Sequence, residues 1–157
     1  MAKVNYVKGD ATAPIGLGNK IIVHVCNDIG GWGKGFVLAI SKRWREPEQE
    51  YRAWYKSQDG FELGKVQFVQ VEEDIWVANL IGQHKIRRDK NGNPPIRYSA
   101  IQAGMREVYR FAEKLGASVH MPRIGCGLAG GRWDKIEPIL DHELTANGVD
   151  TTVYDFE

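Results

Sequence analysis

The stretch that decides the fold is IIVHVCNDIGGWGKG, residues 21–35. Residues 21–26 form a mainly apolar run without alternation, which is typical of a strand buried on both faces of a sheet. Four glycines crowd into residues 30–35, and residues 36–43 have the pattern of a helix. A buried strand that leads through a glycine-rich turn into a helix is the repeating unit of an α/β fold.

A second unit of this kind lies near the other end of the chain, SVHMPRIGCGLAGG at residues 118–131. Glycine loops bring main-chain N–H groups close to a ligand, and a following helix adds its positive N-terminal end, so such loops bind phosphates. If the two strands are neighbours, both loops lie at the carboxyl edge of the sheet. We therefore expect a diphosphate between residues 30–35 and 125–131. The alternative is that both segments are only tight turns.

Further strands are predicted at 5–8, 66–71, 75–80 and 151–156, and further helices at 46–56, 99–115 and 133–146. Ser99 and Gln102 have the spacing of a capping box, Gly116 ends that helix, and Pro138 lies near the start of the last one. Residues 72–74 join two strands as a hairpin, so the sheet is mixed. We predict one domain, residues 1–157, with a three-layer α/β/α fold around about six strands.

Composition narrows the classes of function. The 157 residues carry 21 Lys and Arg against 20 Asp and Glu, and 43% of them are hydrophobic. This composition is typical of a compact globular protein. The near-zero net charge gives no overall positive potential that would attract a polyanion. No apolar run reaches about 20 residues and no signal-peptide core is present, so we expect a cytoplasmic protein without membrane contact. Cys26 and Cys126 lack metal-ligand spacing, and we expect no metal and no cofactor.

Five segments, in order, resemble the macrodomain family: VKGDAT (7–12), IVHVCN (22–27), GWGKG (31–35), MPRIGCGL (121–128) and TVYDF (152–156). The chain looks closest to the branch that contains ADP-ribose 1″-phosphate phosphatases and terminal ADP-ribose protein glycohydrolases. The resemblance implies a monomer that binds ADP-ribose or ADP-ribose 1″-phosphate at the carboxyl edge of the sheet, and ADP-ribosylated macromolecules as further partners.

The resemblance also implies roles for single residues. Asp10, between Gly9 and Ala11, accepts a hydrogen bond from the adenine amino group, and Asn27 holds the distal ribose. Tyr154 and Phe156 are candidates for packing against adenine. The two loops around the diphosphate and distal ribose supply Gly31, Trp32, Gly33, Lys34, Gly35, Pro122, Ile124, Gly125, Cys126, Gly127 and Leu128. From the residues alone, Asp10 serves equally well as a turn residue, and at least one of the two aromatics belongs to the core.

The chain departs from the family at two positions. Where glycohydrolases of this branch have a lysine and an aspartate, it has Gln83 and Ala129, and Lys85 replaces the amine only in a shifted register. Without an amine there is no Schiff-base-like adduct, so water-based hydrolysis or plain binding remains. Asp28 or His24 is then the expected base, with Asn27 positioning the ribose.

Each of these residues also has a structural interpretation. His24 lies in an apolar run and suits a packed core histidine better, whereas Asp28 lies at the mouth of the first loop. Trp32 is expected to form a lid over the distal ribose. Residues 82–97 form a long loop of the kind that is more often functional, and its basic run 85–90 could steer an anionic ligand. His84, in that loop, fits an exposed surface histidine.

Three functions therefore remain open. The chain hydrolyses ADP-ribose 1″-phosphate or an ADP-ribosyl linkage. Alternatively, it is a non-catalytic reader of ADP-ribose and ADP-ribosylated partners, which the departures at Gln83 and Ala129 favour. The third possibility is a general nucleotide-binding fold that prefers NAD or another adenylate.

Overall fold

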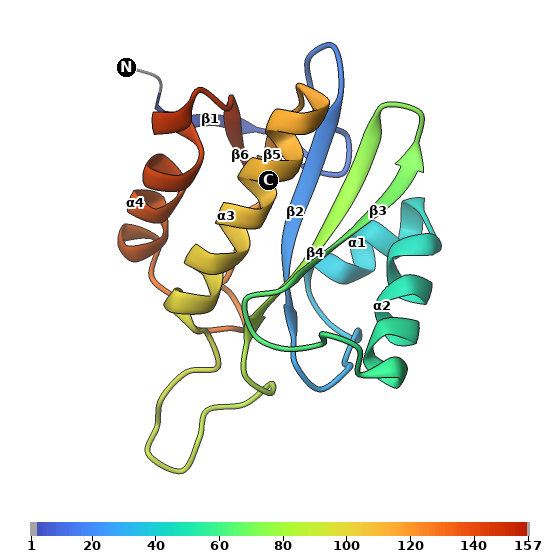
Figure 1. Ribbon diagram of the computed structural model, residues 1–157. Helices are drawn as coiled ribbons and strands as arrows, with labels where there is room; N and C mark the ends of the chain where they lie inside the picture. The colour runs from blue at the N-terminus through green and yellow to red at the C-terminus, as the bar shows by residue number, and fades with distance from the viewer. Residues whose placement is uncertain (1–2, 157) are drawn as a thin grey trace.

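A computed structural model describes residues 3–156 of the chain (Figure 1). The strands are β1 (Asn5–Lys8), β2 (Lys20–Asn27), β3 (Val66–Glu72), β4 (Ile75–Gln83), β5 (Ser118–Met121) and β6 (Thr151–Asp155). The helices are α1 (Phe36–Arg43), α2 (Glu46–Ser57), α3 (Tyr98–Leu115), α4 (Trp133–Glu143) and a short 3₁₀ helix (Thr145–Asn147). Each predicted strand and helix is confirmed within a few residues at either end.

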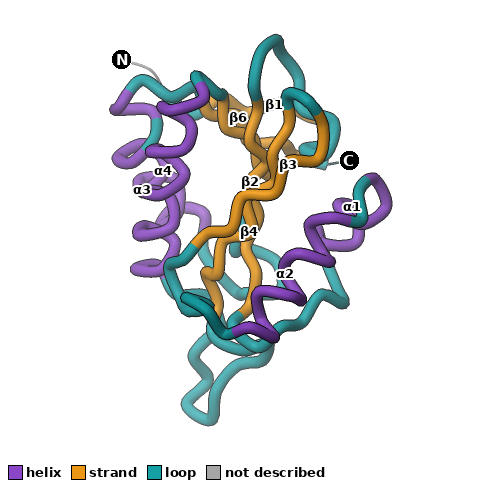
Figure 2. The backbone as a smooth tube through the Cα atoms, turned by 45° about the vertical axis from the view of Figure 1, so that its right-hand side comes forward, coloured by secondary structure: helices purple, strands orange, loops and turns teal. Residues whose placement is uncertain are grey.

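The strands form one six-stranded sheet in the order β1-β6-β5-β2-β4-β3. Every neighbouring pair is parallel except β3 and β4, which are antiparallel, so the predicted hairpin and the mixed sheet are confirmed. Figure 2 shows the sheet between two helical layers, with α3 and α4 on one side and α1 and α2 on the other. The three-layer α/β/α architecture is therefore the observed fold.

Strand β2 lies at the centre of the molecule. Seven of its eight residues are buried, and alternate side chains enter two separate cores. Ile21 and Val23 pack in the core that α3 and α4 cover, whereas Ile22 and Cys26 pack in the core beside α1 and α2. Because apolar side chains are needed on both faces, the sequence of this strand does not alternate with polar residues.

Two predictions about helix ends are wrong. The N-cap of α3 is Arg97 and not Ser99, so Ser99 lies inside the first turn. Gln102 donates to Glu143 instead of closing a capping box. Pro138 is not near the start of its helix, because α4 begins at Trp133 and Pro138 lies in its interior. By contrast, Gly116 ends α3 as predicted, in the left-handed conformation that glycine adopts without strain.

Within residues 3–156, no helix is both long enough and apolar enough to cross a bilayer.

Candidate functional site

The two glycine loops meet at one edge of the sheet. Strands β2 and β5 pair in parallel, with Ile21 beside Val119, so the segments that follow them leave from the same edge. A Cβ atom built on Gly35 of the first loop would lie 3.8 Å from Cδ1 of Leu128 in the second. The loops are therefore in contact, as the sequence predicted for neighbouring strands.

Glycines in these loops serve two different purposes. A side chain added at Gly33 or Gly127 would meet none of the described atoms within 4 Å, so the main chain there faces open space. A Cβ atom at Gly131 would instead lie 2.4 Å from the carbonyl oxygen of Gly125, and these two residues are joined by a 2.7 Å N–H···O hydrogen bond. The second loop is thus closed on itself at its base and leaves bare backbone exposed at its tip.

The long loop 84–97 extends from the lower end of the molecule in Figure 1 and lies against both glycine loops. Ile86 reaches the first glycine loop, because its Cδ1 would lie 3.1 Å from a Cβ atom built on Gly31. At the other end of the long loop, the N–H of Ile96 donates to the carbonyl oxygen of Ala129 at 3.1 Å, and Pro94 packs closely against Gly130. The long loop therefore contacts both glycine loops.

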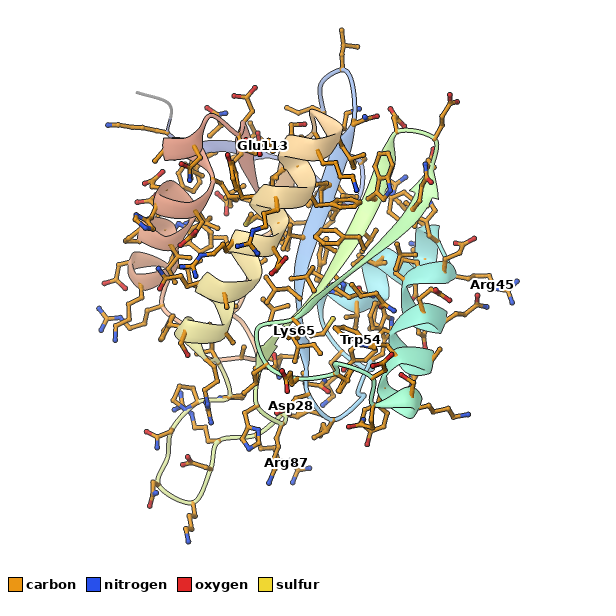
Figure 3. All side chains as sticks on the ribbon, viewed as in Figure 1. Asp28, Arg45, Trp54, Lys65, Arg87 and Glu113 are labelled. Atoms are coloured by element: carbon orange, nitrogen blue, oxygen red, sulfur yellow. The ribbon has the colours of Figure 1, made fainter. Side chains whose placement is uncertain are left out.

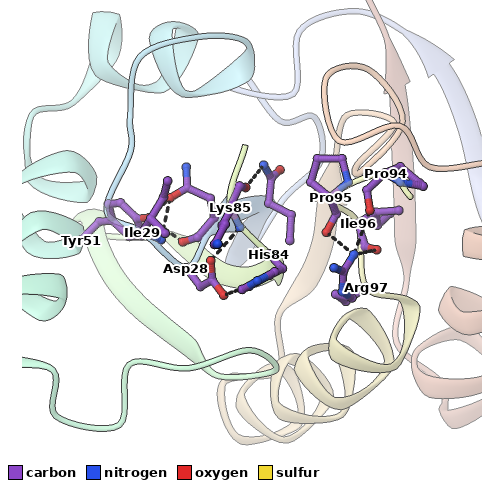
Figure 4. Close-up of polar contacts among 11 residues, drawn as sticks. Asp28, Ile29, Tyr51, His84, Lys85, Pro94, Pro95, Ile96 and Arg97 are labelled. Atoms are coloured by element: carbon purple, nitrogen blue, oxygen red, sulfur yellow. Dashed lines mark hydrogen bonds and ion pairs between the residues drawn. The ribbon is translucent and has the colours of Figure 1, made fainter. Parts of the chain in front are cut away.

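Asp28 and His84 are joined by a hydrogen bond across this edge. The Oδ2 atom of Asp28 lies 2.6 Å from Nδ1 of His84, and Oδ1 accepts the main-chain N–H of Lys85 at 2.7 Å (Figure 4). His84 is exposed at 44% of its side chain, as the sequence predicted, but it also has a carboxylate partner that the sequence did not predict. The contact follows from strand register: Asn27 and Gln83 are partners on neighbouring parallel strands, so the residues that follow them emerge side by side.

Asn27 holds the first glycine loop in shape. Its Oδ1 atom accepts the main-chain N–H groups of Ile29 and Gly31 at 3.0 and 2.9 Å, and its amide donates to the carbonyl oxygen of Gly31 at 2.9 Å. The hydroxyl of Tyr51, from α2, donates to the main-chain oxygen of Asn27 at 2.6 Å. The observed contacts of this amide are thus with its own loop, and contact with the distal ribose stays a prediction.

The adenine side of the expected site lies beyond β1 and β6. Lys8, Gly9, Asp10 and Phe156 line a shallow pocket of about 330 Å³, and Phe156 is 80% exposed. The neighbouring Ala11 is buried, so only its main chain is available to a ligand. An exposed aromatic ring next to a carboxylate is a suitable surface for a base.

Asp10 also organises the turn in which it lies. Its Oδ1 atom accepts the N–H of Thr12 at 2.8 Å and the hydroxyl of Thr12 at 2.7 Å, and Nη2 of Arg43 lies 3.7 Å from Oδ2. Partial burial acts to raise the pKa of Asp10, but the hydrogen bonds from Thr12 and the charge of Arg43 outweigh it and lower this pKa. The group is therefore a carboxylate that can only accept hydrogen bonds.

Tyr154 is part of the core. Its side chain is almost fully buried, and its hydroxyl accepts the main-chain N–H of Ile15 at 2.9 Å and lies 2.7 Å from Nδ1 of His120. Phe156 is thus the aromatic residue that remains available at the surface, which agrees with the expectation that at least one of the two is structural.

Two further predictions are corrected by burial. His24 is 2% exposed, its Nε2 lies 2.5 Å from Oδ1 of Asn79, and burial lowers its pKa to about 4, so it is a neutral core residue rather than a base in contact with substrate. Trp32 is 4% exposed and donates from Nε1 to Ser41 at 2.7 Å, with its ring 5.4 Å from that of Tyr51. It does not form a lid, because its apolar surface is already covered by the core beside α1 and α2.

The remaining loop residues differ in exposure. Lys34 and Leu128 are exposed, Pro122 and Cys126 are partly buried, and Ile124 is 3% exposed and packs in the core. Burial raises the pKa of the Cys126 thiol, so this side chain behaves as a small neutral group. Within residues 3–156, no three His, Cys, Asp or Glu side chains come together as a metal site would require.

No family model matches the chain. It is 32% identical over 163 residues to mouse Chromodomain-helicase-DNA-binding protein 1-like, where the match covers 98% of this chain and 18% of the mouse protein. The chain thus spans less than a fifth of that relative's length. An ADP-ribose 1″-phosphate phosphatase from Candida albicans is 28% identical over 148 residues, covering 87% of this chain and 91% of the yeast protein.

Solved structures give closer matches. A protein of unknown function from Bacteroides thetaiotaomicron is 60% identical with a TM-score of 0.97, covering 98% of both chains. A macrodomain protein from Streptomyces coelicolor is 53% identical with a TM-score of 0.87, covering 98% of this chain and 99% of its own. DarTG from Thermosipho africanus, solved in complex with ADP-ribose, is 19% identical with a TM-score of 0.71 and shares the fold over 87% of this chain and 38% of its own.

Proposed function

The chain belongs to the macrodomain family, and we propose that it binds ADP-ribose along the two glycine loops and the pocket at Asp10, and hydrolyses ADP-ribose 1″-phosphate or an ADP-ribosyl linkage. One observation carries the binding proposal: two glycine loops from neighbouring parallel strands touch, and each exposes backbone at a glycine that faces open space. Main-chain N–H groups and helix N-termini at such loops favour an anion.

The pocket at Asp10 and the two glycine loops suit different parts of ADP-ribose. The pocket at Asp10 and Phe156 offers an acceptor-only carboxylate and an exposed ring, which favour an amino-bearing adenine over a keto-bearing base. The glycine loops are proposed to hold the diphosphate, and the edge at Asn27 is proposed to receive the distal ribose. DarTG from Thermosipho africanus, which shares this fold, was solved in complex with ADP-ribose, and this supports ADP-ribose as the ligand.

The lysyl chemistry of related glycohydrolases is not proposed for this chain. Strand register places Gln83 opposite Asn27, and the Gln83 amide donates to the carbonyl oxygen of Lys85 at 2.9 Å. Lys85 follows two residues later with its main chain tied to Asp28, so no register shift brings its amine to the position of Gln83. A water-dependent reaction is therefore the catalytic route that these residues support.

Titration calorimetry with ADP-ribose, with NAD as the competing ligand, tests the binding proposal. We expect ADP-ribose to bind and NAD to compete poorly. Preference for NAD would support a general adenylate site instead. A phosphate-release assay on ADP-ribose 1″-phosphate tests the hydrolysis.

A second candidate function is a reader of ADP-ribosylated partners. It is favoured by Gln83 and Ala129, which cannot supply an amine and a carboxylate. Binding of ADP-ribose without turnover of ADP-ribose 1″-phosphate or of an ADP-ribosylated protein would support the reader.

A further inference from the structure

Both oxygen atoms of the Asp28 carboxylate are hydrogen-bonded to protein groups. Oδ1 accepts the main-chain N–H of Lys85 at 2.7 Å, and Oδ2 lies 2.6 Å from Nδ1 of His84. Asp28 is 17% exposed at its side chain, against 44% for His84. A carboxylate held in this way orients an imidazole, while the imidazole is the group that meets solvent and ligands.

The hydrogen bond also fixes which nitrogen of His84 is basic. The ionised Asp28 can only accept, so Nδ1 carries the hydrogen and donates it to Oδ2. In the neutral ring the lone pair then lies on Nε2, which points away from Asp28. This is the tautomer that takes up a proton at Nε2.

His84 lies where the long loop meets the two glycine loops. Asp28 joins it to the first glycine loop, and the N–H of His84 donates to the carbonyl oxygen of Pro95 at 2.8 Å. The adjoining Pro94 packs against Gly130 of the second glycine loop. Figure 4 shows the ring between Asp28 on one side and the segment of Pro95 to Arg97 on the other.

The other histidines lack this combination of support and access. His24 and His120 are buried, and burial lowers the pKa of each to about 4. His142 lies on α4 and is 74% exposed. Figure 3 shows that Asp28 lies at the same end of the molecule as Arg87, which points outward from the long loop.

We propose that His84 is the proton-transferring group of this site and that Asp28 is its positioning residue. The inference rests on the hydrolytic part of the proposed function. His84 Nε2 takes a proton from a water molecule, and the water oxygen forms a bond to the phosphorus of ADP-ribose 1″-phosphate. The bond from phosphorus to the 1″ oxygen breaks, and its electron pair stays on that oxygen. The proton on Nε2 then passes to the 1″ oxygen, which gives ADP-ribose and inorganic phosphate.

The test compares His84→Ala, Asp28→Asn and the control His142→Ala with the unmodified protein, measuring phosphate release and calorimetric binding of ADP-ribose. In His84→Ala we expect kcat to fall about 10²–10⁴-fold while KM and the ADP-ribose Kd stay within about threefold. Added imidazole should restore part of the lost kcat. Asp28→Asn should lower kcat with unchanged binding, because an amide no longer enforces the tautomer. His142→Ala should match the unmodified protein.

Three results would overturn the inference. The first is an unchanged kcat in His84→Ala. The second is a parallel loss of binding and kcat that imidazole does not restore, which would mark a structural role. The third is an unmodified protein that binds ADP-ribose but releases no phosphate, and this result would leave the binding proposal intact. Failure to bind ADP-ribose at all would instead refute the proposed function itself.

Discussion

The hydroxyl of Tyr51 lies 2.6 Å from the main-chain oxygen of Asn27 and 3.0 Å from its side-chain oxygen. Tyr51 is fully buried in α2, and burial raises the pKa of its phenol far above the usual range, so it stays a neutral donor. Through this hydroxyl group, a helix on one face of the sheet supports the first glycine loop.

Tyr51→Phe should therefore loosen the first loop while leaving the ring packing intact. We expect the free energy of unfolding to fall by about 1–2 kcal/mol, because a buried acceptor loses its donor. ADP-ribose affinity should fall about tenfold, measured by calorimetry. Tyr55→Phe, on the same helix, is the matched control and should change neither quantity appreciably. Unaltered affinity in Tyr51→Phe would show that this loop does not contact the ligand.

Gly127→Val should abolish ADP-ribose binding without destabilising the fold. A side chain there meets open space in the free protein but would occupy the position expected for the diphosphate. Gly131→Ala is the contrasting variant, since its Cβ would lie 2.4 Å from the Gly125 carbonyl oxygen and should cost about 1–3 kcal/mol. Thermal melts and calorimetry separate the two effects. If the folded Gly127→Val protein bound ADP-ribose with unchanged affinity, the ligand could not lie against this loop.

Asp10→Asn should weaken adenine-bearing ligands by about tenfold, since one of two acceptor oxygens becomes a donor. The amide oxygen can still accept from Thr12, so the turn should persist. Asp10→Ala should weaken binding similarly and also lower the free energy of unfolding by about 1 kcal/mol, because the Thr12 contacts are lost. Affinities for ADP-ribose and its hypoxanthine analogue provide the readout. A variant that keeps the preference for adenine would exclude Asp10 from base recognition.

Mild acid should destabilise the protein through its buried histidines. His24 and His120 have pKa values of about 4 in the folded state, against an ordinary value of 6.5, because burial disfavours the charged ring. Between pH 6.5 and 4 the unfolded chain therefore binds more protons, and stability falls as the pH falls. From pH 7 to 5 each residue should cost about 2 kcal/mol.

Urea unfolding at the two pH values measures this loss. His24→Gln, which keeps a donor for Asn79 but does not titrate, should reduce the loss by about 2 kcal/mol. An identical pH dependence in the variant and the unmodified protein would show that His24 does not contribute.

Much of the fold could be predicted because its signals are local. The apolar run of β2 specifies a strand with two covered faces, and the glycines after it specify where the chain must turn. Helix ends were predicted less well. Ser99 and Gln102 have capping-box spacing, yet the long loop delivers the chain to α3 with Arg97 already extended, so the helix starts one residue before Ser99.

Some features of the site could likewise be predicted from local sequence, and others could not. The sequence placed both glycine loops at one edge, because strand direction and neighbouring strands suffice for that inference. It wrongly predicted that Trp32 forms a lid, and it did not predict the contact of His84 with Asp28. Whether an aromatic ring is covered, or an imidazole has a carboxylate partner, depends on segments distant in the chain.

The sequence alone determined the order of strands and helices and the two glycine turns, since propensity and periodicity act over a few neighbouring residues. Its ordered motifs also carried the resemblance to macrodomains. Only the tertiary structure decided that Trp32 is covered by the core, that Tyr51 supports the first loop and that Asp28 meets His84. The physical reason is distance along the chain: 56 residues separate Asp28 from His84, and only parallel pairing of β2 with β4 brings their carboxyl ends together.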